Sequence, residues 1–394
     1  MPLLLDLSHT SHTRARTGIQ RVARAIHREL EGRCEAVCFD PYEGAWRPLE
    51  PWEERNLTAA DPASGRGARW PLGARVRGRA RAFLHRTPPL EAPRPGDKGP
   101  VGVIVPEIFS ADAAAGLPAL FAAARGPRVA LFHDAIALQF PEYTPRSTSA
   151  RFPGYLRDLL QFDGVAAVSE DSRRCLVDYW AWLGAARTPQ VAAIPLGIDT
   201  PRANPPPAPA GDVPTVLCVG SIEGRKNHAA LLDACESLWS RGARFELRLI
   251  GLANPETGAP ALERIERLRA AGRPVRYAGP EGDGALEAAY GECVFTVYPS
   301  IAEGFGLPVA ESLVRGRPCL CRTEGALGEI AAGGGCMSLG AAGAGEIAAA
   351  MGVLLASPYE LALLDAAARA RRFKGWAQYA GELLDWMGTL GRAS

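Results

Sequence analysis

Residues 293–311, C-V-F-T-V-Y-P-S-I-A-E-G-F-G-L-P-V-A-E, contain one complete step of an α/β fold. The stretch opens with the apolar run 293–298, passes through a glycine-containing loop and enters a helix predicted over 308–315. A short apolar run that ends at a proline favours a strand buried on both faces. Pro308 suits the first turn of the helix that follows. The stretch therefore predicts a strand, a loop and a helix of a parallel sheet.

The same alternation extends along most of the chain. Strands are predicted at 215–220 and 245–251 with a helix at 227–240 between them, and the first half has similar runs at 101–105 and 128–132. Strands that alternate with helices predict parallel sheets with right-handed crossovers, here in two copies. Such sheets bind ligands at the carboxyl ends of their strands, and we expect the main site in a cleft between the two.

The division into domains follows the changes in composition. We predict an N-terminal α/β domain over 1–199, in which 41–100 is an irregular insertion rich in Arg and Pro. The stretch 200–214 holds six prolines and is predicted to be a linker. The C-terminal α/β domain is predicted over 215–375, and a last helix in 376–394 is expected to pack back on the N-terminal domain.

Composition excludes several classes of protein. The 394 residues are 47% apolar, which suits two buried sheets, and the net charge of +1 argues against a nucleic-acid binder. No apolar run reaches the length of a membrane span, and residues 2–7 are predicted to be a first strand instead of a signal peptide. The nine cysteines match no zinc pattern and are expected to be free thiols. We therefore expect a cytoplasmic protein.

The loop between Glu303 and Glu311 is the first candidate site. Gly304 and Gly306 permit a tight loop whose backbone N–H groups feed a helix N-terminus, which favours an anion such as phosphate. A carboxylate beside a phosphate is useful when it accepts hydrogen bonds from hydroxyl groups, as on a sugar or a ribose. The alternative is an ordinary glycine loop with two solvated glutamates.

A second candidate follows the strand predicted at 215–220. Arg225 and Lys226 are adjacent cations at its carboxyl end, and such a pair suits a diphosphate leaving group. Glu223 lies close enough in sequence to pair with them and reduce their charge. The alternative is a solvated basic turn.

Two further candidates lie in the first half. His133 directly follows the apolar run 128–132, where a side chain is expected to point into the cleft; the alternative is a polar strand end, with His133 bonded to the local backbone. Gly18 lies in the loop after the first strand, where a backbone N–H group can approach a phosphate or the acceptor. His9 and His12 share this loop, and for both we favour a structural role.

Several motifs are absent from the sequence. There is no Asp-x-Asp pair of the kind that carries a metal in the other large architecture of nucleotide-sugar transferases. The dinucleotide fingerprint, the P-loop and the nucleophile elbow are also absent. We therefore expect no metal and no cofactor besides the donor.

The candidate clusters, in their order along the chain, resemble the motifs of the retaining glycosyltransferases of the GT-B architecture, specifically glycosyltransferase family 4. Glu303 and Glu311 match its E-x7-E signature, and 225–227 match its R-K-x-H/N stretch. H-D-x-x-x-L from His133 is similar to mannosyl- and rhamnosyltransferase-like members that build bacterial surface polysaccharides. The resemblance implies two Rossmann-like domains whose parallel sheets face each other across a cleft.

The resemblance also implies roles for individual residues. Glu303 and His133 are expected to contact the donor sugar, and Arg225 and Lys226 to neutralise the departing diphosphate without a metal. Donor binding is expected at Gly18, Ser221, Phe305, Gly306, Leu307 and Glu311.

The activity implied is transfer of a hexose, with mannose, rhamnose or a related deoxysugar favoured, from a GDP-, dTDP- or UDP-linked donor to a saccharide or a lipid-linked saccharide. No side chain is an evident nucleophile, so same-face attack with retention is favoured. The rival functions are a sugar epimerase or phosphorylase of the same shape and a non-catalytic nucleotide-sugar-binding subunit.

The segment 66–86 stands apart because it carries seven arginines and no acidic residue, with apolar side chains between them. One interpretation is peripheral contact with an anionic membrane that carries the acceptor, at the inner face of the cell membrane. The other, which the poor helical period favours, is a mobile solvated insertion.

Overall fold

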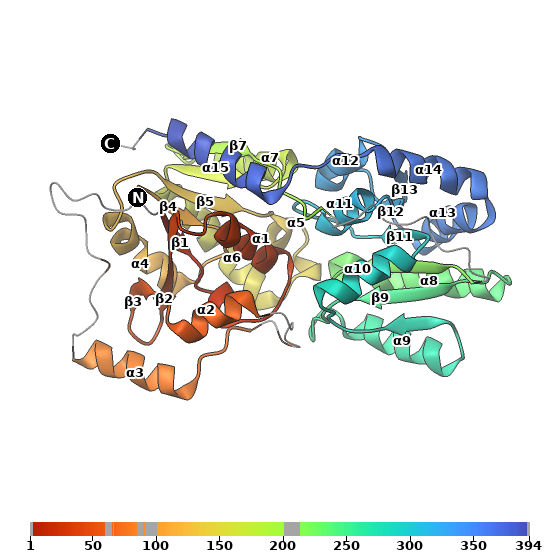
Figure 1. The fold of residues 1–394 in the computed structure, drawn as a ribbon, viewed down its shortest axis with the longest axis horizontal. Coiled ribbons are helices and arrows are strands. Elements are labelled where there is room, and N and C mark those ends of the chain that lie inside the picture. The colour runs from red at the N-terminus through yellow and green to blue at the C-terminus, as the bar shows by residue number, and fades with distance from the viewer. Residues whose placement is uncertain are drawn as a thin grey trace. The chain divides into compact units, whose positions relative to one another are not determined.

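The computed structural model describes residues 3–59, 65, 67–84, 90, 101–200 and 213–391, and the chain divides into two α/β units (Figure 1). Unit 1 comprises Met1–Asp134, Ala150–Leu196 and Trp376–Ser394, and unit 2 comprises Ala135–Ser149 and Gly197–Gly375. The prediction of two parallel-sheet domains is confirmed. Most of the predicted linker 200–214 lies outside the described residues.

One predicted boundary is wrong, because residues 135–149 belong to unit 2. Tyr143 packs against Gly224, so closely that a Cβ at Gly224 would lie 3.2 Å from the tyrosine ring. The backbone N–H of Arg146 points at Glu256, 3.4 Å away. Both contacts depend on the folded structure and leave no local trace in the sequence.

The sheet of unit 1 has the strand order β3-β2-β1-β4-β5-β6-β7. All neighbouring strands are parallel except β2 and β3, which form an antiparallel pair at one edge. The chain order reverses between β1 and β4, and ligands of such sheets bind at this switch point. The strands are β1 (Leu3–Asp6), β2 (Cys34–Asp40), β3 (Ala45–Pro48), β4 (Val103–Val105), β5 (Arg128–Phe132), β6 (Gly164–Ala167) and β7 (Gln190–Ala193).

Helices surround this sheet, and the last helix of the chain is one of them (Figure 1). Helix α15 buries Trp376, Tyr379, Leu383 and Met387, which recur at helical spacing, and it contacts α1. Met387 lies close enough to Gly102 that a Cβ there would meet its methyl group at 2.3 Å. The helices with members in unit 1 are α1 (Gly18–Glu29), α2 (Pro51–Thr58), α3 (Leu72–Phe83), α4 (Ala111–Ala122), α6 (Arg146–Asp158), α7 (Glu170–Leu183) and α15 (Trp376–Thr389).

The prediction that 41–100 is irregular is wrong for its described residues, which form β3, α2 and α3. Helix α2 begins with a capping box between Glu50 and Glu53, and Glu53 is also held by Arg47. The large apolar side chains of α3 are exposed, so its pattern does not resemble that of a core-facing helix. The helical pattern of these residues is therefore weak, and the abundance of arginine and proline suggested irregular structure instead.

The sheet of unit 2 is wholly parallel, with the order β10-β9-β8-β11-β12-β13. Its core lies on both faces. Val216 and Cys218 of β8 pack toward α8 (His228–Ser240), α9 (Ala259–Ala270) and α13 (Ala344–Ala356), while Leu217 between them packs toward α10 (Asp283–Glu292). The order reverses between β8 and β11, which puts a second switch point there. The strands are β8 (Thr215–Val219), β9 (Glu246–Ile250), β10 (Val275–Tyr277), β11 (Phe295–Tyr298), β12 (Cys319–Cys321) and β13 (Cys336–Ser338).

The helices of unit 2 include the two predicted at 227–240 and 308–315. They are α5 (Ile136–Gln139), α8 (His228–Ser240), α9 (Ala259–Ala270), α10 (Asp283–Glu292), α11 (Leu307–Val314), α12 (Gly325–Ala331), α13 (Ala344–Ala356) and α14 (Pro358–Ala370). No single helix among the described residues has the length and apolar character to cross a membrane. By those two criteria alone α13 and α14 together would pass, but they meet at an angle of 96°.

Candidate functional site

The two predicted clusters of unit 2 meet at the switch point of its sheet. Arg225 and Lys226 lie in the 3-10 turn Gly224–Lys226 after β8, and Glu303 lies in the loop after β11. Because β8 and β11 are parallel neighbours, their carboxyl ends share one edge. Backbone bonds tie the loops together, since the N–H of Ile301 donates to the carbonyl of Arg225 over 2.8 Å.

Glu303 is the centre of this cluster. Its Oε1 lies 2.5 Å from Nζ of Lys226 and 2.8 Å from Nη1 of Arg225. The hydroxyl groups of Tyr298 and Ser300 donate to the same oxygen, the first over 2.9 Å. Its side chain is only 8% exposed, so four donors satisfy one oxygen of a buried carboxylate.

This arrangement fixes the charge of Glu303. Burial by itself would raise the pKa of the carboxyl group, but the charges of Arg225 and Lys226 and the hydrogen bonds of Lys226 and Ser300 lower it to about 2. Glu303 is therefore ionised at neutral pH. Arg225 also pairs with Glu223 over 2.9 Å, as the sequence allowed. The cluster carries two cations and two anions, and an anionic ligand would compete with the carboxylates for the cations.

Glu311 occupies a different environment from Glu303. It lies on α11, is 3% exposed, and accepts a hydrogen bond from the hydroxyl of Tyr290 over 3.2 Å. The alternative of a solvated glutamate is therefore wrong for Glu311. The E-x7-E spacing places one carboxylate among cations and the other beside a phenol of α10.

The glycine loop reaches α11 through Gly306, which has a φ of 102° at the N-cap. Phe305 and Ser221 are half-buried in the two loops, and Leu307 is buried at the first position of α11. A helix N-terminus favours an anion, but at α11 Pro308 has no N–H and the N–H of Val309 donates to the carbonyl of Gly306 over 3.0 Å.

Replacing Gly306 by alanine is expected to destabilise the protein by about 1–3 kcal/mol, because the left-handed φ is strained for a residue with a side chain. The new Cβ would also lie 2.6 Å from the side chain of Leu327. Urea unfolding measures the loss. Gly345→Ala in α13 is the control, since a Cβ there meets nothing within 4 Å. Equal stability of the two variants would contradict the strain.

The candidate residues of unit 1 lie at the carboxyl edge of its own sheet. His133 follows β5 and is 7% exposed, and its Nε2 lies 2.7 Å from the carbonyl of Pro106. A carbonyl only accepts, so Nε2 carries a proton. Burial lowers the pKa of His133, against the opposing effects of Pro106 and Asp134. The imidazole is therefore neutral at pH 7, and its Nδ1 is left as an acceptor.

Gly18 is the first residue of α1, and Thr17 is its N-cap. The loop before it is fixed by Glu107, which accepts from the backbone N–H groups of His9 and Thr10 over 2.9 and 3.2 Å. His9 lies 3.1 Å from the amide of Gln20. The structural role favoured for His9 agrees with these contacts.

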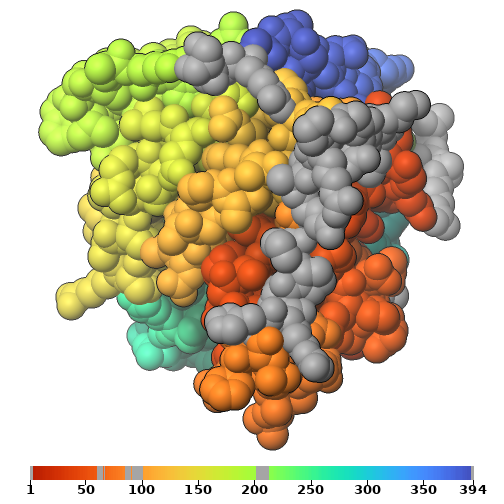
Figure 2. Space-filling model, turned by 90° about the vertical axis from the view of Figure 1, so that its left-hand side faces the viewer, coloured from red at the N-terminus to blue at the C-terminus, as the bar shows by residue number. Residues whose placement is uncertain are grey.

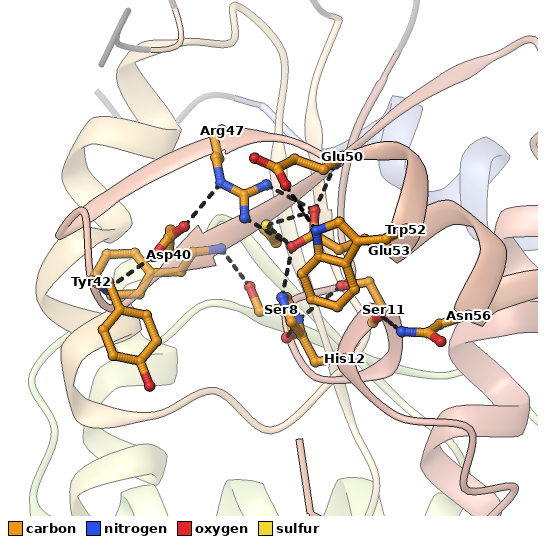
Figure 3. A network of polar contacts seen from close by, with 12 residues as sticks. Ser8, Ser11, His12, Asp40, Tyr42, Arg47, Glu50, Trp52, Glu53 and Asn56 are labelled. Atoms are coloured by element: carbon orange, nitrogen blue, oxygen red, sulfur yellow. Dashed lines mark hydrogen bonds and ion pairs between the residues drawn. The ribbon is translucent and has the colours of Figure 1, made fainter. Parts of the chain in front are cut away.

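Only one group of side chains in the described part of the chain has the spacing of a metal site: His12, Cys38 and Glu53. Both oxygens of Glu53 are taken by the guanidinium of Arg47, at 2.8 Å each, and one also faces His12 at 2.7 Å (Figure 3). A metal ion would have to displace or face that guanidinium. These contacts describe a structural ion-pair network and do not favour a metal.

Comparison with known protein families gives a match within unit 2. Residues 213–357 match the family model described as glycosyl transferases group 1. Unit 2 contains a glycosyl transferase group 1 domain. The Glu303 cluster, Gly306 and Glu311 all lie within the matched residues of this group 1 domain.

Two curated relatives from Escherichia coli resemble the chain over longer stretches. The serotype-specific mannosyltransferase WbdA is 24% identical over 348 residues, which are 84% of this chain and 40% of WbdA. The O-antigen chain mannosyltransferase B is 27% identical over 215 residues, which are 51% of this chain and 54% of that protein. The chain thus spans well under two thirds of either relative.

Two solved structures share the fold along the whole chain. HepE of Anabaena, in complex with UDP and glucose, has a TM-score of 0.69 at 16% identity, covering 99% of this chain and all of HepE. Sucrose-phosphate synthase of Thermosynechococcus elongatus has a TM-score of 0.68 at 17% identity, covering all of both chains. At this identity the likeness shows the fold, which is GT-B as predicted.

The sequence analysis did not identify two groups of polar residues. One group surrounds Arg225 and Lys226 in the group 1 domain, and the other lies at the carboxyl edge of the sheet of unit 1. Tyr298 and Ser300 flank Pro299 in the opening stretch, and a hydroxyl at a strand end was the available signal. Asp6 is the last residue of β1 and Glu107 follows β4, and both are at least 98% buried. Burial and the nearby charge of Glu107 raise the pKa of Asp6 to about 7. An acid at the end of an apolar strand was the signal for this pair.

Proposed function

We propose that the chain transfers a hexose from a nucleotide diphosphate sugar to a saccharide or lipid-linked saccharide acceptor. The observation that carries the proposal is the pairing of Arg225 and Lys226 with Glu303 at the switch point of the group 1 domain. The cations are preorganised for the negative charge that develops on a departing diphosphate. The carboxylate beside them is ionised and is a strong acceptor for sugar hydroxyls.

The exchange of partners gives this cluster a means of responding to the donor. Glu303 holds the two cations with its Oε1. A diphosphate takes over part of their charge, which frees lone pairs of Glu303 for hydroxyl groups of the sugar. The group 1 domain would thus assemble its sugar-binding acceptor only when the diphosphate is bound.

We further propose that transfer retains the anomeric configuration and needs no metal. Glu303 is proposed to accept hydrogen bonds from the sugar and not to attack it, because its Oε1 is already held by Arg225 and Lys226. Same-face attack, with a phosphate oxygen taking the proton of the acceptor, is therefore the proposed route. His133 is proposed to contact the sugar through Nδ1, and Glu311 to bind the ribose. Mannose or rhamnose is the favoured hexose, since two similar proteins are named mannosyltransferases, and GDP, dTDP or UDP is the carrier.

The test is release of nucleoside diphosphate from a panel of UDP-, GDP- and dTDP-sugars. We expect release from one donor class, unchanged by a chelator, and loss of release in Glu303→Ala and Lys226→Ala. A donor bound at 100 times its Kd is expected to raise the apparent free energy of unfolding by about 2.7 kcal/mol, which thermal shift detects. If no donor binds or turns over, the transferase proposal fails. Binding without turnover would favour the non-catalytic subunit, and turnover without transfer would favour an epimerase or phosphorylase.

The proposed setting is the synthesis of bacterial surface polysaccharide at the cytoplasmic face of the membrane. The proposal of peripheral membrane contact by 66–86 belongs here, and its described part, α3, is considered next. The product's anomeric configuration, read by NMR coupling constants, tests retention separately from binding.

A further inference from the structure

Helix α3 presents its apolar side chains to solvent. Leu72, Val76 and Phe83 are 76%, 58% and 85% exposed. At about 100° per residue they lie within about 40° of one another around the helix axis. Soluble proteins bury such a stripe, and an exposed one marks a surface that binds another molecule. We call Leu72, Val76 and Phe83 the α3 stripe.

The opposite side of α3 is fixed to unit 1. Ala74 and Gly78 are the buried residues of the helix. A Cβ at Gly78 would lie 2.9 Å from Cβ of Tyr42 and 3.3 Å from a carboxylate oxygen of Asp40, so the backbone of α3 approaches the β2–β3 turn as only glycine allows. The small residues thus decide which side faces inward, and the α3 stripe faces outward.

Acidic residues of unit 1 hold two of the arginines of α3. Arg77 donates to Glu50 over 2.8 Å, and Arg81 lies 3.4 Å from Glu50 and 3.6 Å from Glu43. Glu50 in turn belongs to the Arg47 network (Figure 3). These contacts orient the helix on a rigid, buried base.

The other arginines flank the α3 stripe. The guanidinium groups of Arg75 and Arg79 lie over the ring of Tyr42 at 6.0 and 5.5 Å from its centroid, and no acid lies within the helix to neutralise them. Figure 2 shows α3, in orange, at the lower rim of one face of unit 1, where it projects from the molecule. An apolar stripe bordered by cations and projecting from a folded base matches an anionic lipid surface in shape and charge.

We propose that α3 lies on an anionic bilayer, with Leu72, Val76 and Phe83 entering the boundary between headgroups and acyl chains and Arg75 and Arg79 among the lipid phosphates. The proposed function enters only in the role of this contact, which is to hold the chain beside a lipid-linked acceptor. Each basic residue near an anionic surface strengthens binding by about fivefold. The exposed side chains supply the remaining affinity by leaving water.

The test is flotation of the full chain with vesicles of phosphatidylcholine alone or with about one third phosphatidylglycerol. We expect the chain to float with the anionic vesicles only. The triple variant L72S/V76S/F83S, whose three positions are exposed, is expected to bind them at least tenfold more weakly with an unchanged melting temperature. R75E/R79E is expected to lose binding similarly. Trp182→Ser on α7, at a side chain that is 80% exposed, is the matched control and is expected to bind as the wild type does.

Three outcomes would overturn the proposal. These are absence of flotation with anionic vesicles, equal losses in Trp182→Ser and the triple variant, and a change of oligomeric state in the triple variant without vesicle binding, which would assign the stripe to a second copy. Release of nucleoside diphosphate from a soluble donor without vesicles is expected to be unchanged in the triple variant. The proposal of membrane contact and the proposal of donor chemistry can therefore be disproved independently.

Discussion

Lys226→Met is expected to slow release of nucleoside diphosphate from the donor by about 10²- to 10³-fold. Lys226 is buried beside Tyr298 and Glu303 at the edge where β8 ends. Burial and the charge of Arg225 lower the pKa of Lys226, and Glu303 opposes this shift by stabilising the ammonium form. Methionine has a similar length and no charge, so the loss reports electrostatic stabilisation of the departing diphosphate. The measurement is turnover at saturating donor, which separates this loss from weaker donor binding.

The variant is expected to remain folded. Glu303 keeps Arg225 at 2.8 Å and the hydroxyl of Tyr298 at 2.9 Å, so its carboxylate does not become an unpaired buried charge. Arg264→Met, which removes a cation paired with Asp233 on the surface of unit 2, is the control and is expected to retain full turnover. Turnover of Lys226→Met within tenfold of wild type would contradict the role of Lys226.

Glu303→Gln is expected to destabilise the protein by about 3 kcal/mol at neutral pH. The change removes the carboxylate that Arg225 and Lys226 share, and leaves Glu223 as a partner of Arg225 alone. The same quantity follows from the pKa of Glu303, which lies at about 2 in the folded chain against an ordinary 4.5. That gap corresponds to about 3 kcal/mol of stability. Urea unfolding measures it.

The sign of the pH dependence is set by the lowered pKa. A depressed carboxyl pKa stabilises the folded state fully above 4.5, and the stabilisation is lost as pH falls from there toward 2. The difference between wild type and Glu303→Gln is therefore expected to shrink over this range. Glu287→Gln, in the partly exposed pair with Arg315, is the control and should change stability by at most about 1 kcal/mol. A constant difference between pH 7 and acid unfolding would refute the assignment to Glu303.

The sequence was most informative where one local pattern determined one local structure. The apolar run at 293–298 and Pro308 predicted β11 and α11, which the structure has at Phe295–Tyr298 and Leu307–Val314. Buried parallel strands show as short apolar runs, so the alternation identified both sheets. The E-x7-E stretch and the basic pair identified the cluster that forms at the switch point.

The sequence was least informative where the environment of a side chain depends on distant residues. Glu303 and Glu311 are alike in sequence, yet one is held by cations of the β8 loop and the other lies buried against Tyr290. His133 bonds to Pro106, which comes from a different strand end. Long-range pairing of this kind has no period and no spacing to detect.

The two interpretations of 66–86 also required the tertiary structure. The sequence determined that arginines alternate with apolar residues, and its weak period favoured a mobile insertion. The structure places Gly78 against Tyr42 and Asp40 and buries Ala74, which leaves Leu72, Val76 and Phe83 outward.

By itself, then, the sequence determined two parallel α/β units, because the burial of each strand is encoded in its own apolar run. It also determined the residue types of the candidate site, since cations, carboxylates and glycines carry their chemistry wherever they lie. Only the tertiary structure decided which of these groups meet. That Glu303 faces Arg225 and Lys226, and that α3 turns its apolar side to solvent, follows from contacts between segments far apart in the chain.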